Sequence, residues 1–245
     1  MARIAVEDGI QVMACTPHIT PGLYNNTGPS IRALVTELQA LLSEADIPLD
    51  LVTGADVHIA PDLVVGLESG RVLSLADSRY FLLEPSQTLP PPRFIDLIFD
   101  LTRAGYVPVI THPERFRWIE AHYETIREVV RIGAWTQLTA GSLLGTFGSR
   151  ARYWSERMLD DSLVHIIATD AHNTTRRSPL LSPARDAAAN RVGEAEAHHM
   201  VATRPAGVLA NAGPSELPPL TPPESSAVEG EGLWRRLRRS WGGQD

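Results

Sequence analysis

Short apolar runs alternate with longer amphipathic segments along residues 1–211. The runs are short and apolar on both faces, which is typical of strands buried on both faces of a parallel sheet. Because helical segments separate the runs, the pattern predicts an α/β fold with a parallel sheet, open or closed. A closed barrel of about 250 residues has eight strands, whereas we count six here. The predicted strands are Val12–Cys15, Leu49–Thr53, Tyr80–Leu83, Val107–Ile110, Trp135–Thr139 and Val164–Ala168.

Four amphipathic segments between the runs predict helices. The longest covers Ser30–Ala45, with Ser30 as its N-cap. The segment Phe94–Ala104 follows prolines 90–92 and ends before Gly105, and these residue types favour a helix start and a helix end. The other two helices are predicted at Tyr123–Ile132 and Ala151–Asp160. The apolar stripe of the longest helix consists of Ile31, Leu34, Val35, Leu38, Leu41 and Leu42.

The composition changes near Pro205. Six of the 19 prolines fall in residues 205–223, mixed with Ser, Glu and Gly, which predicts a linker or disordered tail. We therefore expect a folded domain at 1–211, a Pro-rich linker at 212–232 and a Trp/Arg segment at 233–245. As a helix, this last segment would suit an anionic membrane surface or an acidic partner. The alternative, an unstructured terminus, is the one we favour.

The charge and the basic residues exclude several function classes. The chain of 245 residues has a net charge of −7, whereas nucleic-acid-binding domains usually carry a basic face. All 22 basic residues are arginines. The absence of lysine excludes a P-loop and a Schiff-base lysine. Recognition of phosphate or carboxylate must then use arginine side chains or a metal ion.

The cysteine content and the apolar runs indicate the cellular compartment. Cys15 is the single cysteine, so an internal disulfide is excluded and a reducing compartment is expected. The first residues lack the basic region, apolar stretch and cleavage site of a secretory signal. No apolar run approaches the ~18–20 residues that cross a membrane. The sequence therefore predicts a cytoplasmic protein that is not transmembrane.

Side chains that ligate metals follow five of the six predicted strands. The carboxyl ends of parallel strands meet at one edge of an α/β fold, so these side chains are expected to converge. A single histidine after a strand is more often a core or capping residue, but five such strand ends together indicate a site. The residues are His18, Asp56, His58, Glu84, His112, Glu114, Asp170 and His172.

The mixture of imidazoles and carboxylates suits Mn²⁺, Fe²⁺ or Zn²⁺ better than a structural zinc–cysteine site. Three histidines and three carboxylates could hold two metal ions, and two metals about 3.5–4 Å apart activate water and hold a phosphoryl group in line. Arg115, Arg176 and Arg177 lie close to these residues in the sequence and are candidates for binding phosphate. Taken singly, each is equally well explained as a solvated surface arginine.

Motifs for a cysteine or serine nucleophile are absent from the sequence. A cysteine phosphatase loop needs an arginine six residues after the cysteine, but the sixth residue after Cys15 is Pro21. Cys15 is therefore predicted to be a small buried strand residue. The stretch from Gly141 to Gly145 contains a serine but has the wrong spacing for a nucleophile elbow. His198 and His199 lie in a helical stretch and are expected at the surface.

An ordered set of motifs gives these residues a family context. They are Cys15-Thr-Pro-His18, Gly54-Ala-Asp56, Leu83-Glu84, Thr111-His-Pro-Glu-Arg115, Ala140-Gly-Ser-Leu-Leu-Gly-Thr-Phe-Gly148 and Thr169-Asp-Ala-His172. From about residue 3 to 211, the sequence resembles the metal-dependent bacterial tyrosine phosphatases of the polymerase-and-histidinol-phosphatase (PHP) superfamily. These enzymes are associated with capsular and exopolysaccharide synthesis.

The resemblance implies a distorted, incomplete (β/α) TIM-like barrel with a multinuclear metal site, usually of Mn²⁺. It implies removal of phosphate from tyrosines of a partner kinase that controls polysaccharide export. Asp56 occupies a position where the family usually has Glu, which is one methylene longer, and Arg115 matches a phosphate-binding arginine. A second such arginine matches Arg177 better than Arg176. The remaining ligands implied by the match are His18, Glu84, His112, Asp170 and His172, whereas His58 has no assigned role.

One family feature is lacking. Members begin with a strand carrying His-x-His and then an Asp in a Pro-Gly-x-Asp-Asp-Gly turn, so three expected ligands and one barrel strand are missing here. Either the start codon was assigned too late, with Met1 an internal methionine, or the protein is truncated and its site impaired. We favour the first explanation, because a barrel without one strand exposes backbone groups and an apolar interior.

Two other functions are compatible with the motifs. One is a small phosphomonoesterase of the histidinol-phosphate type, although the Gly-Ser-Leu-Leu-Gly-x-Phe-Gly stretch resembles the tyrosine-phosphatase branch more closely. The other is a degenerate, non-catalytic fold that binds a kinase or the polysaccharide machinery. Turnover of the two substrate classes and the metal content of the protein would separate these alternatives.

Overall fold

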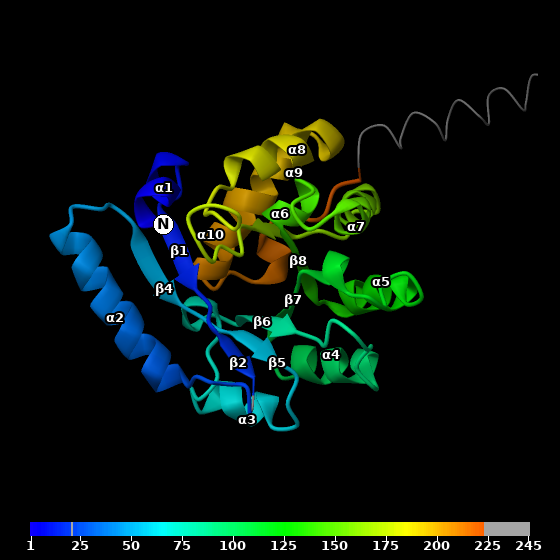
Figure 1. Cartoon of the computed structure of the whole chain (residues 1–245). Helices are drawn as coiled ribbons and strands as arrows, with labels where there is room; N and C mark the ends of the chain where they lie inside the picture. Colours follow the sequence, from blue (N-terminus) through cyan, green and yellow to red (C-terminus); the bar gives the residue numbers. More distant parts are fainter. Residues whose placement is uncertain (21, 223–245) are drawn as a thin grey trace, which may run out of the picture.

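A parallel sheet ringed by helices forms the centre of the computed structural model, which describes residues 1–20 and 22–222 (Figure 1). Its seven strands run in the order β3-β2-β5-β6-β7-β8-β9, and every neighbouring pair except β2–β3 is parallel. The prediction of a parallel α/β sheet is therefore confirmed. The strands are β2 (His18–Thr20), β3 (Tyr24–Asn25), β5 (Asp56–His58), β6 (Tyr80–Glu84), β7 (Val107–Thr111), β8 (Trp135–Thr139) and β9 (Ile166–Ala168).

Two of the predicted strands continue past a break in the backbone. Strands β1 (Val12–Cys15) and β4 (Asp50–Thr53) pair with each other in parallel and then continue as β2 and β5. At the break, the Gly54 amide donates to the Cys15 carbonyl (3.0 Å). A Cβ atom on Gly54 would lie 2.9 Å from a methyl group of Leu75 and 3.1 Å from that of Thr16, so a larger residue would require these side chains to shift. The break lies directly before His18 and Asp56.

The helices follow one another around the sheet, with α2, α3, α4, α5, α7 and α8 in a ring (Figure 1). They are α1 (Ala2–Glu7), α2 (Gly28–Glu44), α3 (Leu63–Glu68), α4 (Phe94–Arg103), α5 (Tyr123–Ile132), α6 (Ala140–Leu143), α7 (Ser149–Asp160), α8 (Ser182–Val192), α9 (Glu194–His198) and α10 (Arg204–Leu209). Three short segments are 3₁₀ turns: η1 (Leu75–Asp77), η2 (Pro113–Arg115) and η4 (Pro214–Glu216). The segment η3 (His199–Thr203) is a π turn.

Helix α2 corrects two details of the prediction. Its N-cap is Thr27, and Ser30 is the third helical residue, whose hydroxyl accepts from the Thr27 amide in a capping box. Half of the predicted apolar stripe is not covered. Ile31, Val35 and Leu42 are buried, whereas Leu34, Leu38 and Leu41 remain 62, 43 and 53% exposed.

The two ends of the sheet are not joined. Among the described strands, β3 and β9 are the ends of the seven-stranded order, so no closed barrel is formed. A side chain instead connects the end of α1 with the start of α8. The Asp8 carboxylate, just after α1, accepts from the backbone amides of Leu181 (2.6 Å) and Ser182 (3.0 Å) at the start of α8. These hydrogen bonds satisfy amides that a helix start leaves without a partner.

Residues 212–222, here called the C-terminal strap, pack against the domain. The guanidinium of the fully buried Arg204 donates to the carbonyls of Pro218 (3.0 Å) and Pro219 (2.8 Å) and to the Glu196 carboxylate (2.8 Å). The Tyr80 hydroxyl donates to the carbonyl of Ala212 (2.9 Å). Ordered packing thus continues past the predicted domain end at 211. The rest of the predicted linker and the Trp/Arg segment at 233–245 lie outside the described residues.

Within the described part of the chain, no helix is long and apolar enough to cross a membrane.

Removing the Arg204 guanidinium should destabilise the domain strongly. Arg204→Leu leaves the Glu196 carboxylate, which is 4% exposed, without its cation, and loss of one partner of a buried ion pair costs about 3–5 kcal/mol. Urea denaturation measures the free energy of unfolding. Arg131→Leu is the matched control, because it breaks an exposed ion pair with Glu128 and should have a much smaller effect. Equal losses in the two variants would contradict this interpretation.

His165 should make the protein less stable in mild acid. Burial, together with the Arg204 guanidinium, lowers the pKa of His165 to about 3. As the pH falls below the ordinary histidine value of about 6.5, the unfolded chain binds a proton that the folded chain does not. The free energy of unfolding should therefore fall with pH by up to about 1.4 kcal/mol per unit from this group.

His165→Asn cannot titrate, and its stability should depend less steeply on pH between 4.5 and 6.5. Urea denaturation at several pH values measures the slope. His198→Asn, at an exposed position, is the control and should keep the wild-type slope. A wild-type slope in His165→Asn would show that His165 does not contribute.

Candidate active site

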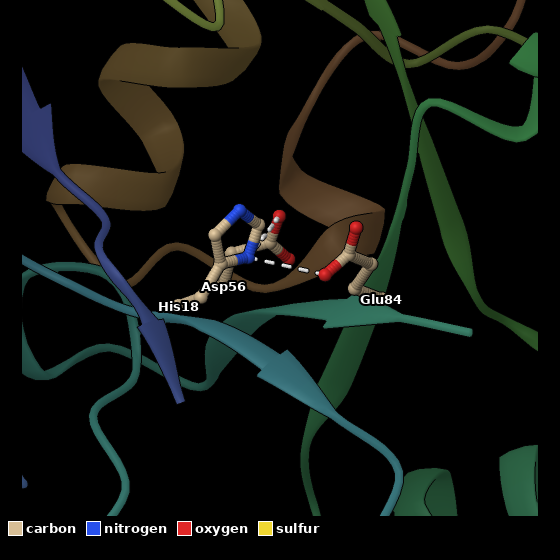
Figure 2. A group of neighbouring side chains, drawn as sticks. All are labelled: His18, Asp56 and Glu84. Carbon is tan, nitrogen blue, oxygen red and sulfur yellow. Dashed lines mark ion pairs between the residues drawn. The ribbon is translucent and has the colours of Figure 1, made fainter. Parts of the chain in front are cut away.

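Three side chains from neighbouring strands point toward one another at one edge of the sheet (Figure 2). His18 begins β2, Asp56 begins β5 and Glu84 ends β6, and the register pairs His18 with Asp56. One potential ligand atom from each lies within 4.8 Å of the others. His18 Nδ1 is 3.1 Å from Glu84 Oε2 and 3.8 Å from Asp56 Oδ2. We call these three residues the donor triad.

His112 approaches the donor triad from the next strand. Its Nε2 lies 3.3 Å from Glu84 Oε1 and 4.0 Å from Asp56 Oδ2. His112 directly follows β7 and has a left-handed backbone (φ +38°), which few non-glycine residues adopt. Such strain is typical of functional positions. Four of the six predicted metal ligands therefore lie together.

Burial and neighbouring charges shift the pKa values of the two carboxylates of the triad in opposite directions. Burial, reinforced by the Glu84 carboxylate, raises the pKa of Asp56 to about 6. Burial alone would also raise the pKa of Glu84, but contacts with His112 and His18 hold it well below its usual range. Glu84 in turn raises the pKa of His18. The arrangement concentrates negative charge between two imidazoles.

The donor set fits a divalent cation. Imidazole and carboxylate ligands without thiolates suit Mn²⁺, Fe²⁺ or Zn²⁺. The Nδ1 atom of His18, which faces Glu84 and Asp56, is buried and makes no well-aligned hydrogen bond, as expected of a polar atom that faces an ion. The Thr111 hydroxyl donates to Asp56 Oδ1 (3.2 Å), and the other oxygen, Oδ2, faces His18 and His112.

Arg115 and Arg177 both contact Asp170, another of the predicted metal ligands. Asp170 also has a left-handed backbone (φ +49°), and its Oδ2 lies 3.2 Å from Arg115 and 2.5 Å from Arg177. The three side chains are 19–25% exposed. Asp170 also contributes to the raised pKa of His18, so this carboxylate lies within electrostatic reach of the donor triad.

Phe147 supports the arginine pair and was not singled out by the sequence analysis. Its ring centre lies 4.6 Å from the guanidinium carbon of Arg115 and 5.7 Å from that of Arg177. A Cβ atom on Gly141 would lie 3.0 Å from the same ring, so the ring packs closely on the backbone there. Phe147 is part of the Gly-Ser-Leu-Leu-Gly-Thr-Phe-Gly motif, so the sequence marked the segment. The contact of its ring with the two arginines depends on the tertiary fold and could not be read from the motif.

The other predicted site residues lie apart from the donor triad. His172 Nδ1 is 2.9 Å from the Asp170 carbonyl and 3.6 Å from Asp170 Oδ1, and its side chain is 46% exposed. Arg176 is exposed, and no ion pair involves it within the described residues. His58 is partly buried on β5 and does not belong to the triad.

Glu114 and Cys15 differ from their predictions. Glu114 is fully buried, burial raises its pKa, and its Oε1 accepts from the Thr139 amide (3.1 Å), so it supports the start of α6 rather than the metal donors. Cys15 lies on β1 as predicted but is only partly buried. His198 is exposed and His199 partly exposed, near the expected surface position.

Removing the Glu84 charge should abolish tight metal binding. Glu84→Gln keeps the shape of the side chain but loses the anion between the two histidines. Loss of a residue that merely supports a ligand costs 10–100-fold in affinity, so this change should cost more than about 100-fold. Calorimetric titration with Mn²⁺ measures the dissociation constant. The exposed Glu68→Gln should bind like the wild type, and equal affinity of both variants would exclude Glu84 as a ligand.

Comparison with known proteins places this geometry in a family. Over 178 residues, 73% of this chain and 70% of the relative, the sequence is 37% identical to the tyrosine-protein phosphatase YwqE of Bacillus subtilis. Over 210 residues, 82% and 85% of the two chains, it is 26% identical to the tyrosine-protein phosphatase CpsB of Streptococcus pneumoniae.

The fold is also similar to a solved structure. A chain from the crystal structures of YwqE and CpsB, described as metal-dependent tyrosine phosphatases, matches with a TM-score of 0.82 and 34% sequence identity. The match covers 87% of this chain and 86% of the other. The family model for capsular polysaccharide synthesis, CpsB/CapC, matches residues 1–210. The chain therefore belongs to the CpsB/CapC family.

Proposed function

We propose that the protein is a metal-dependent phosphotyrosine-protein phosphatase. The observation that carries this proposal is the meeting of two charge systems at Asp170. Asp170 contacts both arginines (3.2 and 2.5 Å), and it also raises the pKa of His18 in the donor triad. With a metal ion held by the triad, a phosphoryl group bound by the arginines would face cations of two kinds, which stabilises the charge of its transition state.

Four residues would hold a metal ion in this function: His18, Asp56, Glu84 and His112. Asp56 would bind through Oδ2 alone, since Thr111 donates to Oδ1. Asp170 and His172 would complete a multinuclear site. A bound divalent ion, with Mn²⁺ the first to test, would supply Lewis-acid stabilisation of phosphoryl oxygens.

The arginine pair would bind the phosphoryl oxygens. Arg115 and Arg177 share Oδ2 of Asp170, and a phosphate would offer both guanidinium groups stronger paired hydrogen bonds. Phe147 lies against both guanidinium groups and limits their rotation, which keeps their donors aimed at one point. Because the chain contains no lysine, these arginines carry the phosphate recognition that the protein itself provides.

The substrate we propose is phosphotyrosine on a kinase that controls capsule or exopolysaccharide export, in the cytoplasm. The family name and the phosphatase relatives support this assignment. We further propose that the sheet is an incomplete (β/α) TIM-like barrel of the PHP type. The parallel strand order supports it, as does the contact of Asp8 with α8 across the open side.

Hydrolysis of a phosphotyrosine peptide with Mn²⁺, with and without a chelator, tests this function. The wild type should release phosphate, lose that activity with chelator, and prefer the peptide to L-histidinol phosphate. Arg177→Lys replaces the planar guanidinium, which can donate two parallel hydrogen bonds to a phosphate, with an ammonium group. It should lower kcat/KM by about 100-fold, as loss of one transition-state donor does. The matched control Arg176→Lys, at the exposed neighbour, should retain activity. Activity that persists in chelator, or equal effects of the two substitutions, would contradict the proposal.

A further inference from the structure

A surface groove lies between two segments that follow Arg115 and Phe147 along the chain. Its volume is about 610 Å³, and it lies between the loop that follows η2 and the first turns of α7. The lining residues are Glu120, Ser149, Arg150, Tyr153 and Trp154. We call it the Tyr153 groove.

Both walls of the Tyr153 groove are continuations of segments that build the arginine pair. One wall begins just after Arg115, where the Arg150 guanidinium donates to the carbonyls of Phe116 (3.0 Å) and Arg117 (3.2 Å). The other begins at Ser149, two residues after Phe147, whose ring contacts Arg115. The lining thus begins five residues after Arg115 and two residues after Phe147, close along the chain to the groups that would bind phosphate.

The chemistry of the groove suits a polypeptide. Tyr153 is 57% exposed, and its ring stands at 78° to that of Trp154, which is only 8% exposed and forms the floor of the groove, with ring centres 5.1 Å apart. Exposed aromatic rings with a polar rim are typical of protein interfaces, because they bury a large area with little loss of side-chain entropy. Arg150 and Glu120 provide such a rim with both signs of charge. A small phosphomonoester held by the arginine pair would leave this surface unused.

We propose that the Tyr153 groove docks the polypeptide segment next to the phosphotyrosine of the substrate, with an apolar side chain of that segment against Tyr153 and Trp154. This inference rests on the proposed phosphatase function. It adds a determinant of substrate choice outside the metal donors and the arginine pair, and it predicts a preference among phosphotyrosine peptides.

The test compares peptide and small-molecule kinetics. The substrates are p-nitrophenyl phosphate and two phosphotyrosine peptides, one with leucine and isoleucine beside the phosphotyrosine and one with glycine and serine. The measured quantity is the ratio of KM for each peptide to KM for p-nitrophenyl phosphate. Tyr153→Ala should raise this ratio about fivefold for the apolar peptide, which is the effect of losing an interface residue worth about 1 kcal/mol. It should also abolish the wild-type preference for that peptide.

A second variant fills the groove rather than emptying it. Ser149→Trp places a bulky ring at an exposed position of the lining and should raise the same ratio. Leu34→Ala is the matched control, since it truncates a side chain that is 62% exposed on α2, outside the groove lining. It should leave both KM values unchanged.

The outcomes separate the two proposals. If the wild type hydrolyses neither peptide, the phosphatase function is wrong. If the wild type hydrolyses both peptides without preference, or either groove variant keeps the wild-type ratio, the docking proposal is overturned while the phosphatase function stands. A rise in the ratio for Leu34→Ala as well would also overturn it, because the effect would not be specific to the groove.

Discussion

The contact of one carboxylate with two imidazoles determines the candidate site. Glu84 lies 3.1 Å from His18 and 3.3 Å from His112, which come from β2 and from the end of β7. These strands are separated by β5 and β6, so the contact requires four parallel strands to stay in register. Buried charges need partners. The sheet, the break before β2 and the left-handed turn at His112 together supply them.

The positions of most strands, and the convergence of His18, Asp56, Glu84 and His112, followed from the sequence because both depend on local patterns. Consecutive apolar residues mark buried strands, and polar residues at their ends mark one edge of a parallel sheet. Tertiary contacts decided the rest. Periodicity did not reveal that Leu34, Leu38 and Leu41 on α2 remain exposed, since it identifies an apolar stripe but not the neighbour that covers it. Nor did it reveal the packing of the C-terminal strap, which depends on Arg204.

The arginine pair also depended on contacts across the fold. Arg115 and Arg177 are 62 positions apart in the numbering but share Oδ2 of Asp170 and the ring of Phe147. Sequence analysis placed Asp170 among the metal ligands, and the structure adds its contact with both arginines. One carboxylate thus contacts both arginines that we propose to bind phosphate and also acts on His18 among the predicted metal donors. A change of charge at the metal donors would therefore alter the electrostatic potential at the arginine pair. This coupling favours a site that binds a metal ion and an oxyanion together.

The proposed activity requires that the donor triad and His112 hold the catalytic ion. Crystals grown with Mn²⁺ and measured at the manganese absorption edge would locate the ion directly by anomalous scattering. We expect an anomalous peak within bonding distance of His18, Asp56 Oδ2, Glu84 and His112. A peak elsewhere, with these four side chains unliganded in a protein that is active with Mn²⁺, would contradict the account.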